Sequence, residues 1–232
     1  PSSQTITVHY ATANGATDPA TGGASCSEGN DYVTTGGTLT FNPGETSKTV
    51  SVPICGEVLY EPNETLRVTL DTPTNATLSD ADGLGTITND DAAPVFTIDD
   101  VTHDEGNSGT TAYTFTVTKT GGTAFSATVN FATVDGTATT GDSDYQGQTG
   151  TLSFGAADTS KQITVLVTGD TKYEANEAFT VHLSAPSNAA ISDADGVGTI
   201  TNDDGAPGLS INDVSQAEGN SSETGMVFTV NL

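Results

Sequence analysis

The sequence predicts an all-β chain built from tandem antiparallel β-sandwiches, and three observations carry this prediction. Of the 232 residues, 26 are Gly and only 34% are hydrophobic, a composition typical of small β domains with modest cores. Short runs alternate apolar residues with Thr or Ser, which is the period of half-buried strands. A domain-sized segment also occurs more than once, so the chain consists of copies of one unit.

The repeat is clearest in an acidic segment that closes each copy. Residues 80–91, DADGLGTITNDD, return as residues 193–204, DADGVGTITNDD, 113 positions later. Asp31-Tyr32 recurs as Asp144-Tyr145 at the same offset. An offset of this size matches one small domain.

We therefore divide the chain into one whole copy and two partial ones. Residues 94–205 form the whole copy, called the second copy below. Residues 1–92 form a first copy in which the opening strands have no counterpart, and residues 207–232 match only the opening strands of a third copy. Ala-Ala-Pro at residues 92–94 and Gly-Ala-Pro at 205–207 mark the joints. Linkers this short favour stacked modules over beads on a flexible string.

The strands of the second copy can be assigned in chain order. Each run places β-branched or aromatic residues at alternate positions, and turn residues separate the runs. We expect strands at residues 96–98, 112–118, 127–133, 151–154, 162–168, 178–183 and 198–201. About seven strands without a helix predict an immunoglobulin-like antiparallel sandwich, although Trp is absent from the chain.

The charge balance limits the possible partners. Five Lys and Arg residues stand against 30 Asp and Glu residues, which gives a formal net charge of −25. Nucleic acid and anionic membrane surfaces would be repelled, and no apolar run reaches membrane-spanning length. Bound cations are the natural means of neutralising a folded chain with this charge.

Acidic residues recur where strands of the second copy end. In a sandwich, strand ends that are distant in sequence meet at one rim, so their oxygens can converge. Calcium takes six to eight oxygen ligands and suits such a rim, whereas the alternative is a solvated acidic face. Recurrence at fixed offsets favours the calcium hypothesis. The candidate ligands are Glu105, Asp144, Asp170, Glu174, Glu177, Asp203 and Asp204.

Four segments of the second copy resemble the Calx-beta domain. They are GTATTGDSDY at residues 136–145, GTLSF at 150–154, DTKYEANEAF at 170–179 and NDD at 202–204. Their order and spacing are specific, and the resemblance extends over nearly the whole chain. It implies a calcium-binding sandwich, of the kind found in sodium/calcium exchanger regulatory loops and in long secreted bacterial proteins.

The resemblance also implies which residues of each copy bind Ca2+. It assigns the seven acids above to the second copy, and Asn202 stands where a third closing Asp could sit, which implies fewer or weaker ions than in sensor members. The early Glu of the first copy must come from elsewhere, and Glu218 has the matching position in the C-terminal segment. The ligands assigned to the first copy are Asp31, Glu57, Glu61, Glu64, Asp90 and Asp91.

The two cysteines occur only in the first copy. Cys26 lies in an insertion of about eight residues before Asp31, and Cys55 aligns with Thr168 of the second copy. A disulfide between the insertion and the end of the neighbouring long strand is the simplest interpretation, and it indicates an oxidising compartment. Two unrelated buried thiols are the alternative.

No catalytic pattern stands out, so we expect a protein that is not an enzyme. The three His residues are scattered, and aromatic residues, at 6% of the chain, are too few for a sugar-binding cleft. We expect an extracellular or cell-surface structural array: a stalk, filament, surface layer or adhesin in which calcium stiffens rims and joints. The alternatives are a calcium-sensing regulatory module or a non-catalytic part of a large secreted enzyme.

The phase of the repeats predicts the partner. The open edges of the first copy match the strands that residues 207–232 would supply, with Glu218 completing the first-copy ligands. Further copies of the module would then follow head to tail, either within one long chain or between chains by strand donation.

Overall fold

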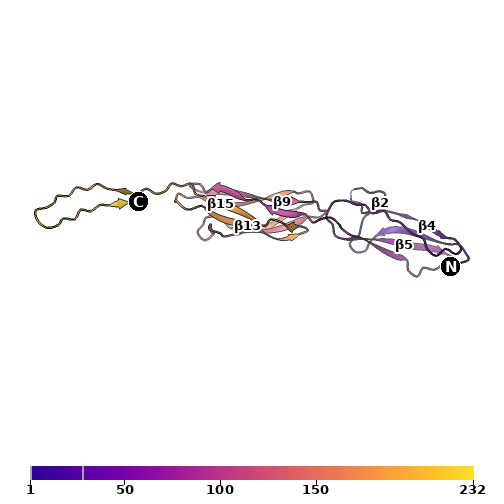
Figure 1. Cartoon of the computed structure of the whole chain (residues 1–232). Coiled ribbons are helices and arrows are strands. Elements are labelled where there is room, and N and C mark those ends of the chain that lie inside the picture. The colour runs from indigo at the N-terminus through magenta and orange to yellow at the C-terminus, as the bar shows by residue number, and fades with distance from the viewer. Residues whose placement is uncertain (1, 28) are drawn as a thin grey trace.

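The computed structural model describes residues 2–27 and 29–232. The first copy, the second copy and the C-terminal segment follow one another in a row and give an elongated molecule (Figure 1). The described residues form strands and no helix, so the predicted all-β class is confirmed. In this part of the chain there is accordingly no apolar helix of membrane-spanning length.

The second copy is a two-layer β-sandwich. One sheet has the strand order β11-β10-β13-β15-β8, and the other has the order β12-β9-β7-β14. The strands are β7 (Val95–Ile98), β8 (Val101–Asp104), β9 (Thr110–Thr120), β10 (Ala127–Val134), β11 (Thr149–Phe154), β12 (Ser160–Thr168), β13 (Glu177–Ser187), β14 (Ala190–Ile191) and β15 (Asp195–Thr201). Seven of them coincide with the predicted runs. The short strands β8 and β14 are additional, and both pair in parallel, so the sheets are not wholly antiparallel.

Alternation along the strands builds the core between the two layers. In β9, Tyr113, Phe115 and Val117 are fully buried, and the Thr residues between them are only half-buried. Phe179 of β13 stacks on the ring of Tyr145 at a centroid distance of 4.4 Å and meets Phe115 edge-on at 5.9 Å. This packing fixes the strand ends, and it therefore fixes the points at which the acidic loops begin.

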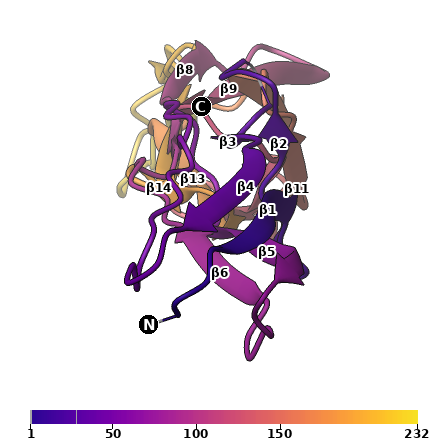
Figure 2. The same cartoon turned by 90° about the vertical axis from the view of Figure 1, so that its right-hand side faces the viewer.

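The first copy contains a four-stranded sheet with the order β4-β1-β5-β6. These strands lie side by side in the view along the molecule (Figure 2). They correspond to β11, β10, β13 and β15 of the second copy. Their bounds are β1 (Ile6–Asn14), β4 (Gly36–Phe41), β5 (Glu64–Thr74) and β6 (Asp82–Ile87), and a short parallel pair joins β2 (Gly22–Gly23) to β3 (Tyr32–Val33).

In the first copy, residues 2–27 and 29–92 form no counterpart of the second sheet, β12-β9-β7-β14. Residues 47–55 are the counterpart of β12, yet they form no strand, and only Ile54 makes an isolated bridge, to Tyr32. The expected long strand ending at Cys55 is therefore wrong. In the second copy β12 pairs along its length with β9, and residues 2–27 and 29–92 supply no counterpart of β9 to complete a ladder.

The C-terminal segment is a long hairpin. Its strands, β16 (Ser210–Ile211) and β17 (Val230–Asn231), pair only with each other in the described structure. The hairpin extends away from the second copy (Figure 1). Its apolar side chains are exposed, with Ile211 at 63% and Phe228 at 52%.

Candidate metal centres

The second rim lies where strands of both sheets end. We use this name for Glu105, Asp144, Asp170, Glu174, Glu177, Asp203 and Asp204. Glu105 follows β8, and Asp203 and Asp204 follow β15, which pairs with β8. One carboxylate oxygen from each of these three side chains lies within 4.8 Å of the others. Strands that are neighbours in the sheet thus bring together acids almost 100 positions apart.

Four acids of the second rim line one hollow. Its lining includes Glu105, Asp144, Asp170 and Glu174. Asp144 is held in place because its carboxylate accepts a 2.8 Å hydrogen bond from the Thr139 amide. Its carbonyl oxygen also accepts a 2.8 Å bond from the Thr168 amide at the end of β12.

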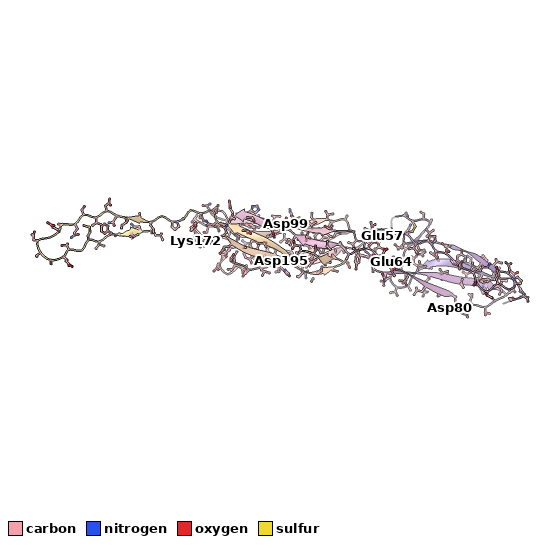
Figure 3. All side chains as sticks on the ribbon, viewed as in Figure 1. Glu57, Glu64, Asp80, Asp99, Lys172 and Asp195 are labelled. Carbon is pink, nitrogen blue, oxygen red and sulfur yellow. A yellow bond between two sulfur atoms is a disulfide. The ribbon has the colours of Figure 1, made fainter. Side chains whose placement is uncertain are left out.

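Two further charged side chains of this hollow are not among the predicted ligands. Asp142 also lines it. Lys172 does too, and its ammonium group lies 3.0 Å from the Asp170 carboxylate, so a cation already neutralises this acid. The pKa of Asp170 is lowered by the backbone amide and ammonium group of Lys172. Figure 3 places Lys172 at the end of the second copy from which the C-terminal segment leaves.

Glu105 has the most perturbed acidity of the second rim. Its side chain is buried, and the residue is only 7% exposed. Burial first, and then the negative charges of Asp170, Glu174, Asp204 and Asp203, raise its pKa to about 7. Crowded carboxylates disfavour one another's ionised form, so this rim holds more negative charge than it can stabilise alone.

The other raised acids of this rim share the same causes. Burial raises the pKa of Glu177, and the neighbouring Asp144 and Glu174 raise it further. Burial also raises the pKa of Asp204, with Asp203 contributing next. A cation placed among these groups would favour their ionised forms.

An asparagine braces the acidic loop of each copy. The Asn202 side chain accepts a 3.1 Å hydrogen bond from the Glu174 amide and donates a 3.0 Å bond to the carbonyl of Asp204. Its own amide donates to the Asn176 side chain at 3.1 Å. This position therefore requires a side chain that both donates and accepts, which explains why it holds an Asn and not a third closing Asp.

The first copy repeats this brace with equivalent residues. The Asn89 side chain accepts from the Glu61 amide at 3.1 Å and donates to the Asp91 carbonyl at 2.9 Å. The Asn89 amide donates to the Asn63 side chain at 3.0 Å. The repeated sequence thus yields the same local geometry twice.

The first rim comprises Asp31, Glu57, Glu61, Glu64, Asp90 and Asp91, which line one hollow. One oxygen each from Asp31, Glu61 and Glu64 lies within 4.8 Å of the others. The Asp31 carboxylate accepts a 2.5 Å hydrogen bond from the Thr21 amide. Figure 3 shows Glu57 and Glu64 at the end of the first copy that meets the second copy.

The acidity of the first rim is perturbed in the same direction. Burial, followed by hydrogen bonding to Asp31 and its charge, raises the pKa of Glu64 to about 7. Burial also raises the pKa of Glu61, with Glu57, Asp31 and Asp91 adding to it. Both copies therefore place mutually repelling carboxylates at the same position in the fold.

The disulfide stands directly behind the first rim. Cys26 and Cys55 are bonded, with their Cα atoms 5.3 Å apart, as the sequence predicts. The Cys55 amide donates a 2.8 Å hydrogen bond to the Asp31 carbonyl, which is the contact that Thr168 makes with Asp144 in the second copy. The bridge therefore ties the insertion to residue 55, whose amide is bonded to the candidate ligand Asp31.

The residues present fit a calcium ion. All the converging groups offer hard oxygen donors, which calcium prefers. One buried side-chain oxygen, Asp204 Oδ2, has no hydrogen-bond partner among the described residues. A buried carboxylate oxygen without a partner is unfavourable unless something compensates it, and a bound cation would do so. That these residues bind metal stays a prediction.

Glu218 is the candidate ligand that lies apart from both rims in this chain. It is exposed on the C-terminal hairpin. Its carbonyl accepts a 3.1 Å hydrogen bond from the Thr224 hydroxyl. Its predicted role requires another copy of the chain, so a single molecule does not test it.

Comparison with known proteins identifies the family. The sequence matches the Calx-beta domain twice, over residues 2–101 and 89–204. It is 32% identical to sodium/calcium exchanger 1 of Canis lupus familiaris over 178 residues, and 30% identical to sodium/calcium exchanger 2 of Homo sapiens over 183 residues. These matches cover 68% and 70% of this chain and 18% and 19% of the exchangers. The chain thus spans about a fifth of the length of these relatives.

Two solved structures of Calx fragments were also matched. The CBD12 fragment of CALX1.2 is 19% identical, with a TM-score of 0.42, over 85% of this chain and 88% of that one. The apo form of the Calx CBD1 domain is 25% identical, with a TM-score of 0.45, over 49% of this chain and all of that one. On the two sequence matches, this chain belongs to the Calx-beta domain family.

Proposed function

We propose that this chain is a calcium-binding structural segment of a repetitive extracellular or cell-surface assembly, such as a stalk, filament, surface layer or adhesin. The observation that carries the proposal is the recurrence of one acidic rim in both copies. Burial and neighbouring carboxylates raise the pKa of Glu64 in the first rim and of its counterpart Glu177 in the second. A site built twice from the same positions favours a function over a chance accumulation of surface acids.

The position of the first rim supports a role in stiffening the joint. The Tyr60 amide donates to the Gly122 carbonyl of the second copy at 3.2 Å, and the Tyr60 carbonyl accepts from the Ala124 amide at 3.4 Å. Tyr60 lies between Glu57 and Glu61 in the acidic loop. An ion held by those two acids would order the same loop that contacts the next module.

The Cys26–Cys55 disulfide supports an extracellular setting, because such bonds persist in oxidising compartments.

A second candidate function is a calcium-sensing regulatory module. The similarity to sodium/calcium exchangers 1 and 2 favours it. A sensor requires two conformations with different partners, whereas a structural segment requires only that calcium stabilise one.

Thermal unfolding of the full chain in calcium and in chelator tests the calcium claim. Calcium at 100 times its Kd adds about 2.7 kcal/mol per site, so we expect a clear rise in melting temperature. Glu174→Ala should reduce the rise. Asp158→Ala removes an acid that lies outside both rims, paired with Lys161 at 2.9 Å, and should leave the calcium-induced rise intact. Equal melting in calcium and in chelator would refute the proposal.

A further inference from the structure

The acidic loops of the two copies share one backbone hydrogen bond. In the first copy the Leu59 amide donates to the Glu57 carboxylate. In the second copy the Lys172 amide donates a 2.7 Å bond to the carboxylate of Asp170, the counterpart of Glu57. The position that makes this bond therefore has the same backbone role in both copies, but its side chain is apolar in one and cationic in the other.

The two side chains at this position have different neighbours. Leu59 lies against the second copy, since a Cβ at Gly122 would be 2.7 Å from the Leu59 Cδ2 atom. Lys172 instead lines the hollow of the second rim, and its ammonium group lies 3.0 Å from Oδ2 of Asp170. The same loop position thus contacts the neighbouring copy in one case and the acids of its own rim in the other.

Both carboxylate oxygens of Asp170 are bonded to Lys172. Oδ1 accepts from the Lys172 amide, and Oδ2 is paired with the ammonium group of the same residue. In contrast, the buried Oδ2 of Asp204 has no hydrogen-bond partner among the described residues. The ammonium group therefore compensates one acid of the second rim and leaves another uncompensated.

The electrostatic attraction on the ammonium group comes from more than Asp170. Hydrogen bonding to Asp170 and its charge, and then the charges of Glu174 and Asp144, raise the pKa of Lys172. Lys172 is the one cation among the described residues that line this hollow. The acids that line it are Glu105, Asp142, Asp144, Asp170 and Glu174. The hollow thus contains a positive charge that belongs to the chain itself.

The hollow of the first rim differs in this respect. Its lining contains the six acids of that rim and no Lys, Arg or His among the described residues. Lys172 is therefore a property of the second copy and not of the repeated loop in general.

We propose that Lys172 is a built-in counter-ion of the second rim, which neutralises Asp170 in the absence of calcium and is displaced when calcium binds. This inference rests on the proposed calcium function. A lysine suits the role because its ammonium group is a point charge on a flexible stem, so it can swing away while the Lys172 amide stays bonded to Asp170. A calcium ion beside Asp170 would repel the ammonium group, and the need to displace it lowers the observed affinity for calcium.

Removal of this counter-ion should have two effects of opposite direction. Without calcium, Asp170 would face Glu174 and Asp144 with no cation nearby, so the metal-free second copy should be less stable. With calcium, no ammonium group would have to be displaced, so the affinity should rise. A residue that only stabilised the loop would lower both stability and affinity when removed.

Calorimetric titration of calcium into Lys172→Leu, at low ionic strength where screening is small, tests the proposal. All chains carry Glu61→Ala, so that the second rim supplies the binding. Leu is the residue of the first copy at this position, which shows that the loop can hold it. We expect the affinity to rise about two- to fivefold, because exposed ion pairs are weak, and the melting temperature in chelator to fall.

Three further variants serve as controls. Lys161→Leu removes the same charge from an ion pair outside both rims, with Asp158 at 2.9 Å, and should leave the calcium affinity unchanged. Lys172→Gln keeps a long side chain without the charge and should match Lys172→Leu. Lys172→Arg keeps the charge and should retain the original affinity.

An unchanged or lower affinity in both Lys172→Leu and Lys172→Gln would overturn the counter-ion role. Calcium binding by the parent chain would in that case still support the proposed function. The absence of calcium binding by every chain, with Glu61 intact or replaced, would reject the calcium function and the counter-ion role together.

Discussion

Glu105 shows how one residue connects the sheet to the rim. It follows β8 directly and is buried, and the negative charges of four other acids act on its carboxyl group. Its pKa of about 7 measures how strongly this environment disfavours the ionised group. A bound cation would reverse that preference.

The metal-free protein should lose stability as the pH rises from 4.5 to about 7. The usual pKa of a glutamate, 4.5, applies to unfolded Glu105, while its folded value is about 7, so the folded state binds more protons in this interval. The stabilisation is fully present below pH 4.5 and is lost through pH 7. Its size is on the order of 3 kcal/mol, since one pKa unit corresponds to about 1.4 kcal/mol.

Urea unfolding in chelator across this range measures the effect. Glu105→Gln should flatten the pH dependence, and Glu223→Gln, on the exposed C-terminal hairpin, should not. A profile of the unmodified chain that rises over the same range would contradict this explanation of Glu105.

Asn202→Asp should destabilise the metal-free second copy. The Asp side chain cannot donate the hydrogen bond that Asn202 gives to the Asp204 carbonyl, and it adds a charge to the crowded rim. Loss of one such bond with a carbonyl left unpaired is worth about 1–3 kcal/mol, which urea unfolding in chelator would detect. Asn130→Asp is the matched control, because Asn130 only accepts from the Thr151 hydroxyl, and an Asp can accept too. Equal unfolding free energies for the two variants would argue against the brace.

The sequence could predict the acidic residues of the rims but not the asparagine hydrogen bonds that hold the acidic loops. Glu105, Asp144 and Glu174 stand out because acids recur at fixed offsets. The braces made by Asn89 and Asn202 do not stand out, because an Asn in a loop has the same appearance whether it is bonded or solvated. Their recurrence at equivalent positions is the signal that could have found them.

At the scale of elements, alternation located the strands of the second copy and failed at residues 47–55. That segment has the same apolar pattern as β12. A strand, however, exists only with a neighbour to share its hydrogen bonds, and residues 2–27 and 29–92 contain no counterpart of β9. The alternating pattern of residues 47–55 is therefore not sufficient to form a strand without a neighbouring strand. The short parallel strands β8 and β14 were not predicted, because runs of two to four residues carry no clear hydrophobic period.

Removing the disulfide should weaken the first copy and its rim. The bridge closes a loop with a sequence separation of 29, for which the chain-entropy treatment gives about 3–4 kcal/mol. Cys26→Ser with Cys55→Ser should also weaken calcium binding at Asp31, whose carbonyl is bonded to the Cys55 amide. Unfolding of the double variant, monitored against the unmodified chain, gives the comparison. The second rim has no Cys and serves as the internal control. A loss of calcium binding confined to the second rim would contradict the role given to the disulfide.

At the scale of the whole molecule, the rims occupy equivalent ends of successive copies. Figure 3 places Glu57 and Glu64 beside the second copy, and Lys172 beside the start of the C-terminal segment. Each rim therefore lies next to whatever module follows. The sequence predicted this arrangement because the closing Asp pair of each copy stands next to its joint. It could not predict the contacts of Tyr60 with residues 122–124, which depend on how the two modules meet.

Isothermal titration of calcium into the metal-free full chain tests the central claim most directly. We expect binding at both rims. Glu61→Ala should remove the contribution of the first rim and Glu174→Ala that of the second, while Asp158→Ala changes neither. The Glu61→Ala/Glu174→Ala double variant should bind almost no calcium. Undiminished binding by the double variant would show that the rims are not the calcium sites, and the absence of any binding heat from the unmodified chain at all temperatures tested would contradict the account as a whole.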